Sequence, residues 1–309
     1  MSREEHAELF AEATTAAPPV LTATRPFYWS LRRELWENRS ISLGPLVITL
    51  LVMVASLIHL LGLPERLGST PTPEAQQGLL ARPFSLAPAP IMLTAFLIGF
   101  FYCLDALYGE RRDRSILFWK SLPVSDRITV LAKASIPLFV LPLYAFLLSV
   151  ATVTLLLLAS LVILSSSAVG VAPLFAELAF FERILVMFYG LAVHTLWFAP
   201  IYCWLLLVSA WARRPPLLWV VLPPVVILVV ERIALGSSLF LALLKYRISG
   251  AMSLAFDPAP KPSVHGVVER AWQLEPLRFL SSPGLWIGLV FAAVCLVLAA
   301  RLRRSRERL

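Results

Sequence analysis

Charged residues are scarce in this chain of 309 residues: Asp, Glu, Lys and Arg make up 15% of it, against about a quarter in an ordinary soluble domain. Hydrophobic residues reach 59%, and they form continuous blocks rather than alternating with polar residues. A membrane-spanning helix needs about 20 mostly apolar residues, whereas a membrane β-strand alternates. The composition therefore excludes an ordinary soluble domain and predicts an all-α membrane protein.

Cysteine and histidine are also few, with three and four residues respectively. Cys103, Cys203 and Cys295 all fall inside apolar blocks, so they provide no disulfide framework and are expected to act as small packing residues. The histidines have no spacing that would bind a metal from one helix, and the HExxH motif is absent. We therefore expect no metal site in this chain.

Motifs for catalysis and for nucleotide binding are missing as well. The chain contains neither GxxxxGK(S/T), whose backbone binds nucleotide phosphates, nor the GxSxG turn that presents a nucleophilic serine. The residues therefore indicate no enzyme, and no cofactor is expected to bind to this chain itself.

Six apolar blocks are long enough to cross a bilayer. Their predicted bounds are Leu43–Leu63, Ala89–Leu107, Ser135–Leu164, Ile184–Ala212, Leu217–Leu235 and Leu285–Ala300. An even number of spans places both termini on one side, and from Arg25 onward 17 basic residues fall on that side against nine on the other. Because cytoplasmic loops carry the excess of Lys and Arg, both termini are predicted to be cytoplasmic. Orientation and anionic lipid headgroups account for the net charge of +8, so no nucleic-acid partner is expected.

The segments outside the spans complete the predicted layout. Residues 1–24 are expected to be a flexible cytoplasmic N-terminus, 25–40 an amphipathic helix, 41–300 the six-span domain, and 301–309 a basic cytoplasmic tail. Within the six-span domain, residues 63–87 are predicted to form an external loop, and residues from about 245 to 283 a longer external segment.

The amphipathic helix is predicted from a helical period of 100° per residue. The apolar side chains that share one face are those of Phe27, Tyr28, Leu31 and Leu35, and the opposite face holds Ser30, Arg33, Glu34 and Glu37. Such a helix is expected to lie in the headgroup plane of the bilayer. The alternative is a short cytosolic helix that packs on protein.

The fifth span is irregular, because Pro223 and Pro224 fall in its middle and the pair Glu231–Arg232 lies near its outer end. A second apolar stretch, Ile233–Leu244, follows directly. One interpretation is a broken helix followed by a short re-entrant or interfacial helix. The other is one long tilted helix whose two charges reach outward to water.

Polar residues within spans are costly and are often functional. The candidates for a pathway or gate are Asp105, His194, Glu231 and Arg232. His194 is the nearest to a midplane. For Asp105 the alternative is pairing with Arg111 or Arg112, and for Glu231 it is pairing with Arg232 or a neighbouring helix.

The loop between the second and third spans combines charge with four consecutive apolar residues. Its candidate functional residues are Glu110, Arg111, Arg112, Arg114, Ile116, Leu117, Phe118, Trp119, Lys120, Leu122, Pro123 and Ser125. If residues 116–119 are helical, they point to all sides, so contact with lipid on one face does not account for all four. A groove on a protein partner does account for them. The alternative is that they pack beneath the protein's own helices.

At this loop the chain resembles the permease subunits of ABC-2 type ABC exporters. Their first cytoplasmic loop has an acidic residue, a short helix, a Leu-Pro-x-Ser turn and a Lys before the third span. That pattern falls here on Glu110, Leu122, Pro123, Ser125 and Lys133. Many members carry a glycine before the short helix, where this chain has Asp113–Arg114–Ser115.

The resemblance implies a coupling helix that docks on a separate cytosolic ATPase subunit, which would bind the ATP and Mg²⁺. It also implies a second permease copy, the same or different, and a bacterial cytoplasmic (inner) membrane. Two other classes stay open: a membrane-embedded hydrolase or transferase using His194, Asp105 or Glu231, and a non-transporting scaffold that recruits a cytosolic protein. The cargo is not identified by the sequence.

Overall fold

The computed structural model describes residues 24–70, 72–113, 124–165, 180–256 and 273–305. Regular structure in these ranges is helical, apart from one isolated bridge between Phe256 and Leu274. Six helical stretches within them are long and apolar enough to cross a membrane. They are Ser40–Leu61, Gly78–Arg112, Asp126–Ser165, Phe180–Trp211, Pro216–Leu235 and Pro283–Ser305. The all-α class and the six predicted spans are therefore confirmed.

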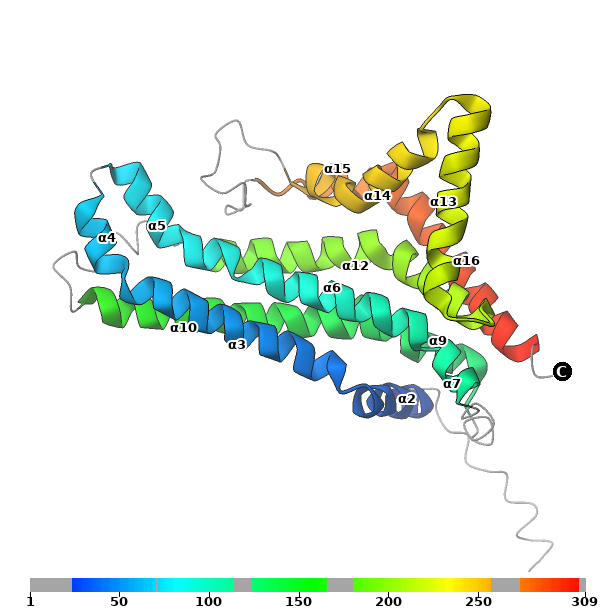
Figure 1. Ribbon diagram of the computed structural model, residues 1–309. Helices are drawn as coiled ribbons and strands as arrows, with labels where there is room; N and C mark the ends of the chain where they lie inside the picture. The colour runs from blue at the N-terminus through cyan, green and yellow to red at the C-terminus, as the bar shows by residue number, and fades with distance from the viewer. Residues whose placement is uncertain (1–23, 71, 114–123, 166–179, 257–272, 306–309) are drawn as a thin grey trace, which may run out of the picture.

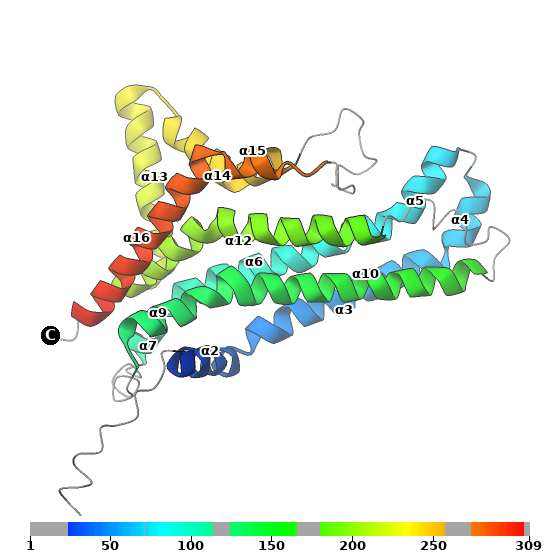
Figure 2. The same ribbon diagram turned by 180° about the vertical axis from the view of Figure 1, so that it is seen from behind.

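Four long helices run side by side as a bundle (Figures 1 and 2). They are α3 (Ser40–Leu61), α6 (Pro88–Asp105), α10 (Leu141–Ser165) and α12 (Phe180–Trp211). Their shared core includes Ile91, Tyr102, Leu141 and Tyr202, each buried. The bundle is held by close packing rather than by a hydrophobic gradient, because lipid is as apolar as the core.

The last span, α16 (Pro283–Ser305), packs along α12 through small side chains. Ala292 and Cys295 of α16 meet Ala199 and Cys203 of α12 in one buried cluster. Short side chains let the two backbones approach closely. The two cysteines therefore act as small packing residues, as expected.

The third span contains a π-helical turn near its start, which is wider than an α-helical turn. Helix α9 (Asp126–Ser135) leads into a π-helical turn, η1 (Ile136–Val140), and then into α10. Pro137 lies in this turn and cannot donate a backbone hydrogen bond. Pro142 of α10 likewise has no N–H to donate to the Leu138 carbonyl four residues before it. That carbonyl accepts instead from the Thr195 hydroxyl on α12, at 2.9 Å, so a second span satisfies the irregular backbone.

The helix before the first span is α2 (Thr24–Glu37), and its polar face is turned inward. Ser30 and Glu34 are buried, whereas Trp29 and Trp36 are exposed and flank the Arg32 guanidinium, at 5.2 and 4.5 Å from their ring centres. The helix therefore packs its charges on protein, through α9. Its placement in a headgroup plane stays a prediction.

Two segments that the sequence assigned to external loops are helical. Residues 63–87 contain α4 (Leu63–Ser69) and α5 (Pro73–Leu86). Pro64 and Pro73 stand in first turns, where no backbone donor is needed, whereas Pro83 lies inside α5. The connection between the first two spans is therefore largely helical, and its external position stays a prediction. Similarly, the external segment predicted from about residue 245 is helical to Ala255.

The fifth span is one unbroken helix, α13 (Pro216–Leu235), followed by a second helix, α14 (Leu239–Ala255). The chain turns at Gly236, whose φ of +61° lies in the left-handed region. The second helix of the first interpretation is present, but the prolines do not break α13. The re-entrant or interfacial placement of α14 stays a prediction. A short helix, α15 (Pro276–Leu280), precedes α16. Figures 1 and 2 show α13 leaving the bundle at a steep angle.

Replacing Gly236 by Ala tests this turn. A Cβ in the left-handed region costs about 1 kcal/mol, so we expect Gly236→Ala to lower the free energy of unfolding by that amount in detergent. Gly190→Ala is the control, because Gly190 lies within α12 with open space beside it. We expect that change to be neutral or stabilising. Equal tolerance of both changes would contradict the assigned turn.

Candidate functional site

Six charged side chains from four helices meet at the end of the bundle where α2, the end of α16 and the loop between the second and third spans lie (Figure 1). The helices are α2, α7 (Tyr108–Arg112), α9 and α16. We call this set the charge cluster. Its members are Arg33, Glu34, Glu110, Asp126, Lys133 and Arg303.

Glu34 is the most buried member, with 2% of its side chain exposed. Its Oε1 lies 2.7 Å from the Lys133 ammonium, which is 3% exposed, and 2.7 Å from the Arg33 guanidinium. Its Oε2 accepts from the Tyr102 hydroxyl of α6 at 2.8 Å. These contacts give both carboxylate oxygens charged or polar donors, which a buried carboxylate requires.

Glu110 connects the remaining helices. One carboxylate oxygen lies 3.1 Å from Lys133 and 3.3 Å from Arg33, and the other lies 2.6 Å from Arg303. Arg303 also binds Asp126 at 2.8 Å, so one guanidinium joins both carboxylates. Glu110 precedes residues 114–123 and Asp126 follows them. Both flanks of the loop are thus tied to the end of the last span.

The charge cluster is balanced, because its three carboxylates face three cations. Burial by itself would raise the pKa of the Glu34 carboxyl, but the adjacent Lys133 ammonium and Arg33 guanidinium outweigh burial and lower this pKa below its ordinary value. Glu34 therefore stays ionised at neutral pH, and the cluster is a network of charges rather than of neutral hydrogen bonds.

A second contact fixes the corner between α6 and α7 on α12. The Ser209 hydroxyl donates to the Leu104 carbonyl at 2.8 Å and accepts from the backbone nitrogens of Leu107 and Tyr108 at 3.1 and 3.0 Å. Arg111 binds the carbonyls of Ser209 and Ala212 at the end of α12. A cation there complements the negative end of the helix dipole.

The predicted coupling residues divide into two groups. Among the described ones, Glu110 belongs to the charge cluster, Arg111 binds α12, Arg112 is exposed, and Ser125 caps α9 by accepting from the Ile128 nitrogen at 3.3 Å. The others lie outside the described residues: Arg114, Ile116, Leu117, Phe118, Trp119, Lys120, Leu122 and Pro123.

The predicted pathway residues do not come together. Asp105 is exposed at the end of α6, with an oxygen 3.9 Å from Arg112, the pairing that the sequence favours as the alternative. His194 lies within the bundle, with its Nε2 3.2 Å from the Tyr202 hydroxyl and its ring against Phe96 and Phe198. The side chains on which the hydrolase alternative depends are thus in separate parts of the chain.

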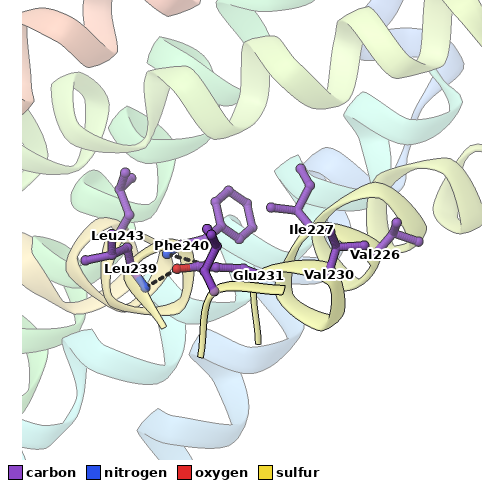
Figure 3. A pocket seen from close by; sticks show the side chains of 8 residues that line it. Val226, Ile227, Val230, Glu231, Leu239, Phe240 and Leu243 are labelled. Carbon is purple, nitrogen blue, oxygen red and sulfur yellow. Dashed lines mark hydrogen bonds between the residues drawn. The ribbon is translucent and has the colours of Figure 1, made fainter. Parts of the chain in front are cut away.

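Glu231 is at the far end of α13, where it caps the helix that follows. Its carboxylate accepts from the Ser237 hydroxyl at 2.6 Å and from the backbone nitrogens of Leu239 and Phe240 at 2.5 and 2.9 Å. Figure 3 shows this carboxylate directed at the first turn of α14. A carboxylate there complements the positive end of the helix dipole. Of the two predicted partners, the neighbouring helix is the one that holds Glu231, because Leu239 and Phe240 belong to α14. Arg232 instead donates to the Gly236 carbonyl at 3.4 Å.

Sequence reasoning missed the partners within the charge cluster. Arg33 and Glu34 were placed on a water-facing side of an amphipathic helix, and Arg303 in a basic tail. One signal was available: Lys133 lies directly before an apolar block that contains no acidic residue. A cation at that position indicates an acidic partner on another helix. Only packing supplies Glu34, which is 99 residues away in sequence.

Comparisons with known proteins do not identify the chain. No protein-family model, curated protein or solved structure matches it.

Removing the Lys133 cation tests the energy of the charge cluster. Lys133→Ala leaves Glu34 buried with one partner fewer, and breaking a buried pair in this way typically costs about 3–5 kcal/mol of unfolding free energy. Chemical denaturation in detergent measures this loss. Arg112→Ala is the matched control, because that arginine binds Asp113 on an exposed surface, where water and salt screen the ion pair and it contributes little to stability. Similar losses in both variants would contradict a buried ionic core.

The lowered pKa of Glu34 predicts a pH dependence. A carboxyl whose folded pKa lies below its ordinary 4.5 stabilises the fold above pH 4.5, and this contribution is lost as pH falls through the folded pKa. Glu34→Gln is therefore expected to be less stable than the natural protein at neutral pH, with the difference shrinking in acid. Unfolding curves from neutral pH to about pH 3 measure it. A difference that does not change with pH would refute the assignment.

Proposed function

We propose that this chain is the membrane-spanning permease subunit of an ATP-binding cassette exporter, driven by a separate cytosolic ATPase subunit. The observation that carries the proposal is the charge cluster, which ties both flanks of the loop between the second and third spans to α2 and to the end of α16. The loop sequence itself resembles the coupling segment of ABC-2 type permeases.

The contacts support a mechanical role for the loop. Glu110 and Asp126 flank residues 114–123, and both bind Arg303, whose side chain is 5% exposed. Because separating buried charges costs several kcal/mol, a displacement of the loop would carry the end of the last span with it. Lys133 extends the same connection to α2, and the Ser209 contacts extend it to α12.

The sequence of residues 116–119, Ile-Leu-Phe-Trp, supplies the surface for the partner. Aromatic anchors surrounded by polar residues are typical of the energetic centre of a protein interface. Nucleotide-driven closure of the ATPase subunits would pull on this segment, and ATP with Mg²⁺ would bind on the partner. A conformational change is explained only by such a differential contact between two states.

The working unit that we propose contains a second permease copy in a bacterial cytoplasmic membrane. Helix α13 contributes to this view, because none of its membrane-spanning window is buried within the single chain. The bilayer or another copy covers this apolar helix. With the cluster end of the bundle facing the cytoplasm, both termini and the loop face the ATPase side.

The double variant Phe118→Ala with Trp119→Ala tests the coupling. Truncating both aromatic side chains is expected to abolish copurification with the proposed cytosolic ATPase subunit when the two are coexpressed, and to remove the ATP hydrolysis that the permease stimulates. Losing two interface anchors worth about 2 kcal/mol each would weaken binding by roughly three orders of magnitude.

The matched control is Phe181→Ala with Trp286→Ala, which removes the same residue types from exposed positions on α12 and α16. This control is expected to keep both copurification and stimulated hydrolysis. Unchanged hydrolysis in the loop variant, or equal loss in the control, would refute coupling through the loop.

A further inference from the structure

Arg247 on α14 has two buried nitrogens without an acceptor among the described residues. Its Nε and Nη2 are buried and lack a hydrogen-bond partner there, while Nη1 donates to the Gly284 carbonyl at 3.1 Å. The guanidinium lies over the Trp197 ring, with its carbon 4.5 Å from the ring centre. The backbone carbonyl of Arg247 also accepts from the Trp197 indole at 2.7 Å. The side chain is thus held firmly while one edge stays unused.

The unused edge has the geometry that anions prefer. Nε and Nη2 together form the side of a guanidinium that binds a carboxylate or phosphate with two parallel hydrogen bonds. No carboxylate within the described ranges forms an ion pair with Arg247. A buried cation without an anion is costly, so the arrangement points to an anion that is not part of the described chain.

The neighbouring span is shaped around this guanidinium. A Cβ added to Gly288 would lie 2.5 Å from Nη2 and 2.9 Å from the guanidinium carbon. Gly288 is in the second turn of α16, close to where the last span begins. A glycine at this position therefore allows Arg247 to lie against α16, near a boundary of the apolar region.

An apolar groove lies along the same face of α14. It has a volume of about 520 Å³ and is formed between α13 and α14, with Phe240 and Leu243 on the α14 side (Figure 3). Phe240, Leu243 and Arg247 are spaced i, i+3 and i+7, so they follow one stripe of the helix. Arg247 stands one turn, about 6 Å, beyond Leu243. The volume of the groove is in the range of small-molecule sites.

We propose that Arg247 and this groove bind one anionic phospholipid, with the headgroup phosphate on the Nε–Nη2 edge and an acyl chain between α13 and α14. A lipid fits because α13 is long and apolar enough to span a membrane and is unburied, so the groove opens towards hydrocarbon. The unpaired cation beside the start of α16 accounts for the anionic headgroup. This site does not depend on the proposed transport function.

The test uses the purified full-length chain in neutral detergent, with phosphatidylglycerol as the probe and phosphatidylcholine as the neutral comparison. Native mass spectrometry counts bound lipid, and thermal unfolding reports stabilisation. Both headgroups carry a phosphate, but the choline cation cancels its charge in phosphatidylcholine. We therefore expect phosphatidylglycerol to bind more tightly than phosphatidylcholine and to raise the unfolding temperature more. Arg247→Gln is expected to weaken phosphatidylglycerol binding about ten-fold or more, which is the loss of a charge-assisted hydrogen-bonded contact.

Lys245→Gln is the matched control, because Lys245 is an exposed cation on the opposite face of the same helix. It is expected to change phosphatidylglycerol binding less than about two-fold, within the range of a surface charge. Leu243→Glu is a second probe that leaves Arg247 in place. A carboxylate in the groove is expected to weaken lipid binding while the contacts of Arg247 with Trp197 and Gly284 persist.

Several outcomes would overturn the lipid site. One is an Arg247→Gln variant that keeps its affinity for phosphatidylglycerol. Another is a variant that loses stability equally in both lipids, because a residue with a purely structural role would behave in this way. A natural chain that does not distinguish the two lipids would mean that the edge is already occupied by another group of the chain. Protection by inorganic phosphate equal to that by phosphatidylglycerol would assign the site to a free anion.

Discussion

The burial of Glu34 against Lys133 is the interaction on which the arrangement of one end of this protein depends. Neither group can be buried alone, because an unpaired charge in an apolar environment is far more costly than a missing hydrophobic contact. The pair, 2.7 Å apart, therefore requires α2 and α9 to stay together. Glu110 and Arg303 complete the network and extend the requirement to α7 and α16. One electrostatic condition thus ties four helices together, alongside apolar contacts such as that of Val130 with Ala299.

Packing elsewhere in the bundle follows a different rule. Between α12 and α16 the contact is made by Ala199, Cys203, Ala292 and Cys295, whose small side chains let the backbones come close. These side chains pack tightly but carry no charged group that would fix the position of one helix along the other. The protein therefore combines a polar junction at one end with a smooth apolar contact along the spans. In a permease, this combination would transmit a movement from the junction into the bundle.

The sequence predicted some features well for physical reasons. Span positions follow from runs of apolar residues, which are local, so the six spans were found within a few residues except where helices extend beyond the apolar core, as Gly78–Arg112 and Asp126–Ser165 do. Prolines inside helices were harder to interpret. Pro223 and Pro224 suggested a break, yet α13 continues through them and the chain turns instead at Gly236. Arg33 and Glu34 were assigned to water because a helical wheel does not show what lies against each face.

What the sequence alone determined is the class of the protein: six apolar helices, the side on which basic residues gather, and a charged loop with an aromatic centre that resembles a coupling segment. What only the tertiary structure decided is how charges separated by as many as 193 residues pair, as Arg303 does with Glu110. The reason is that hydrophobicity is summed over neighbouring residues, whereas an ion pair depends on two atoms brought within about 3 Å by the packing of different helices.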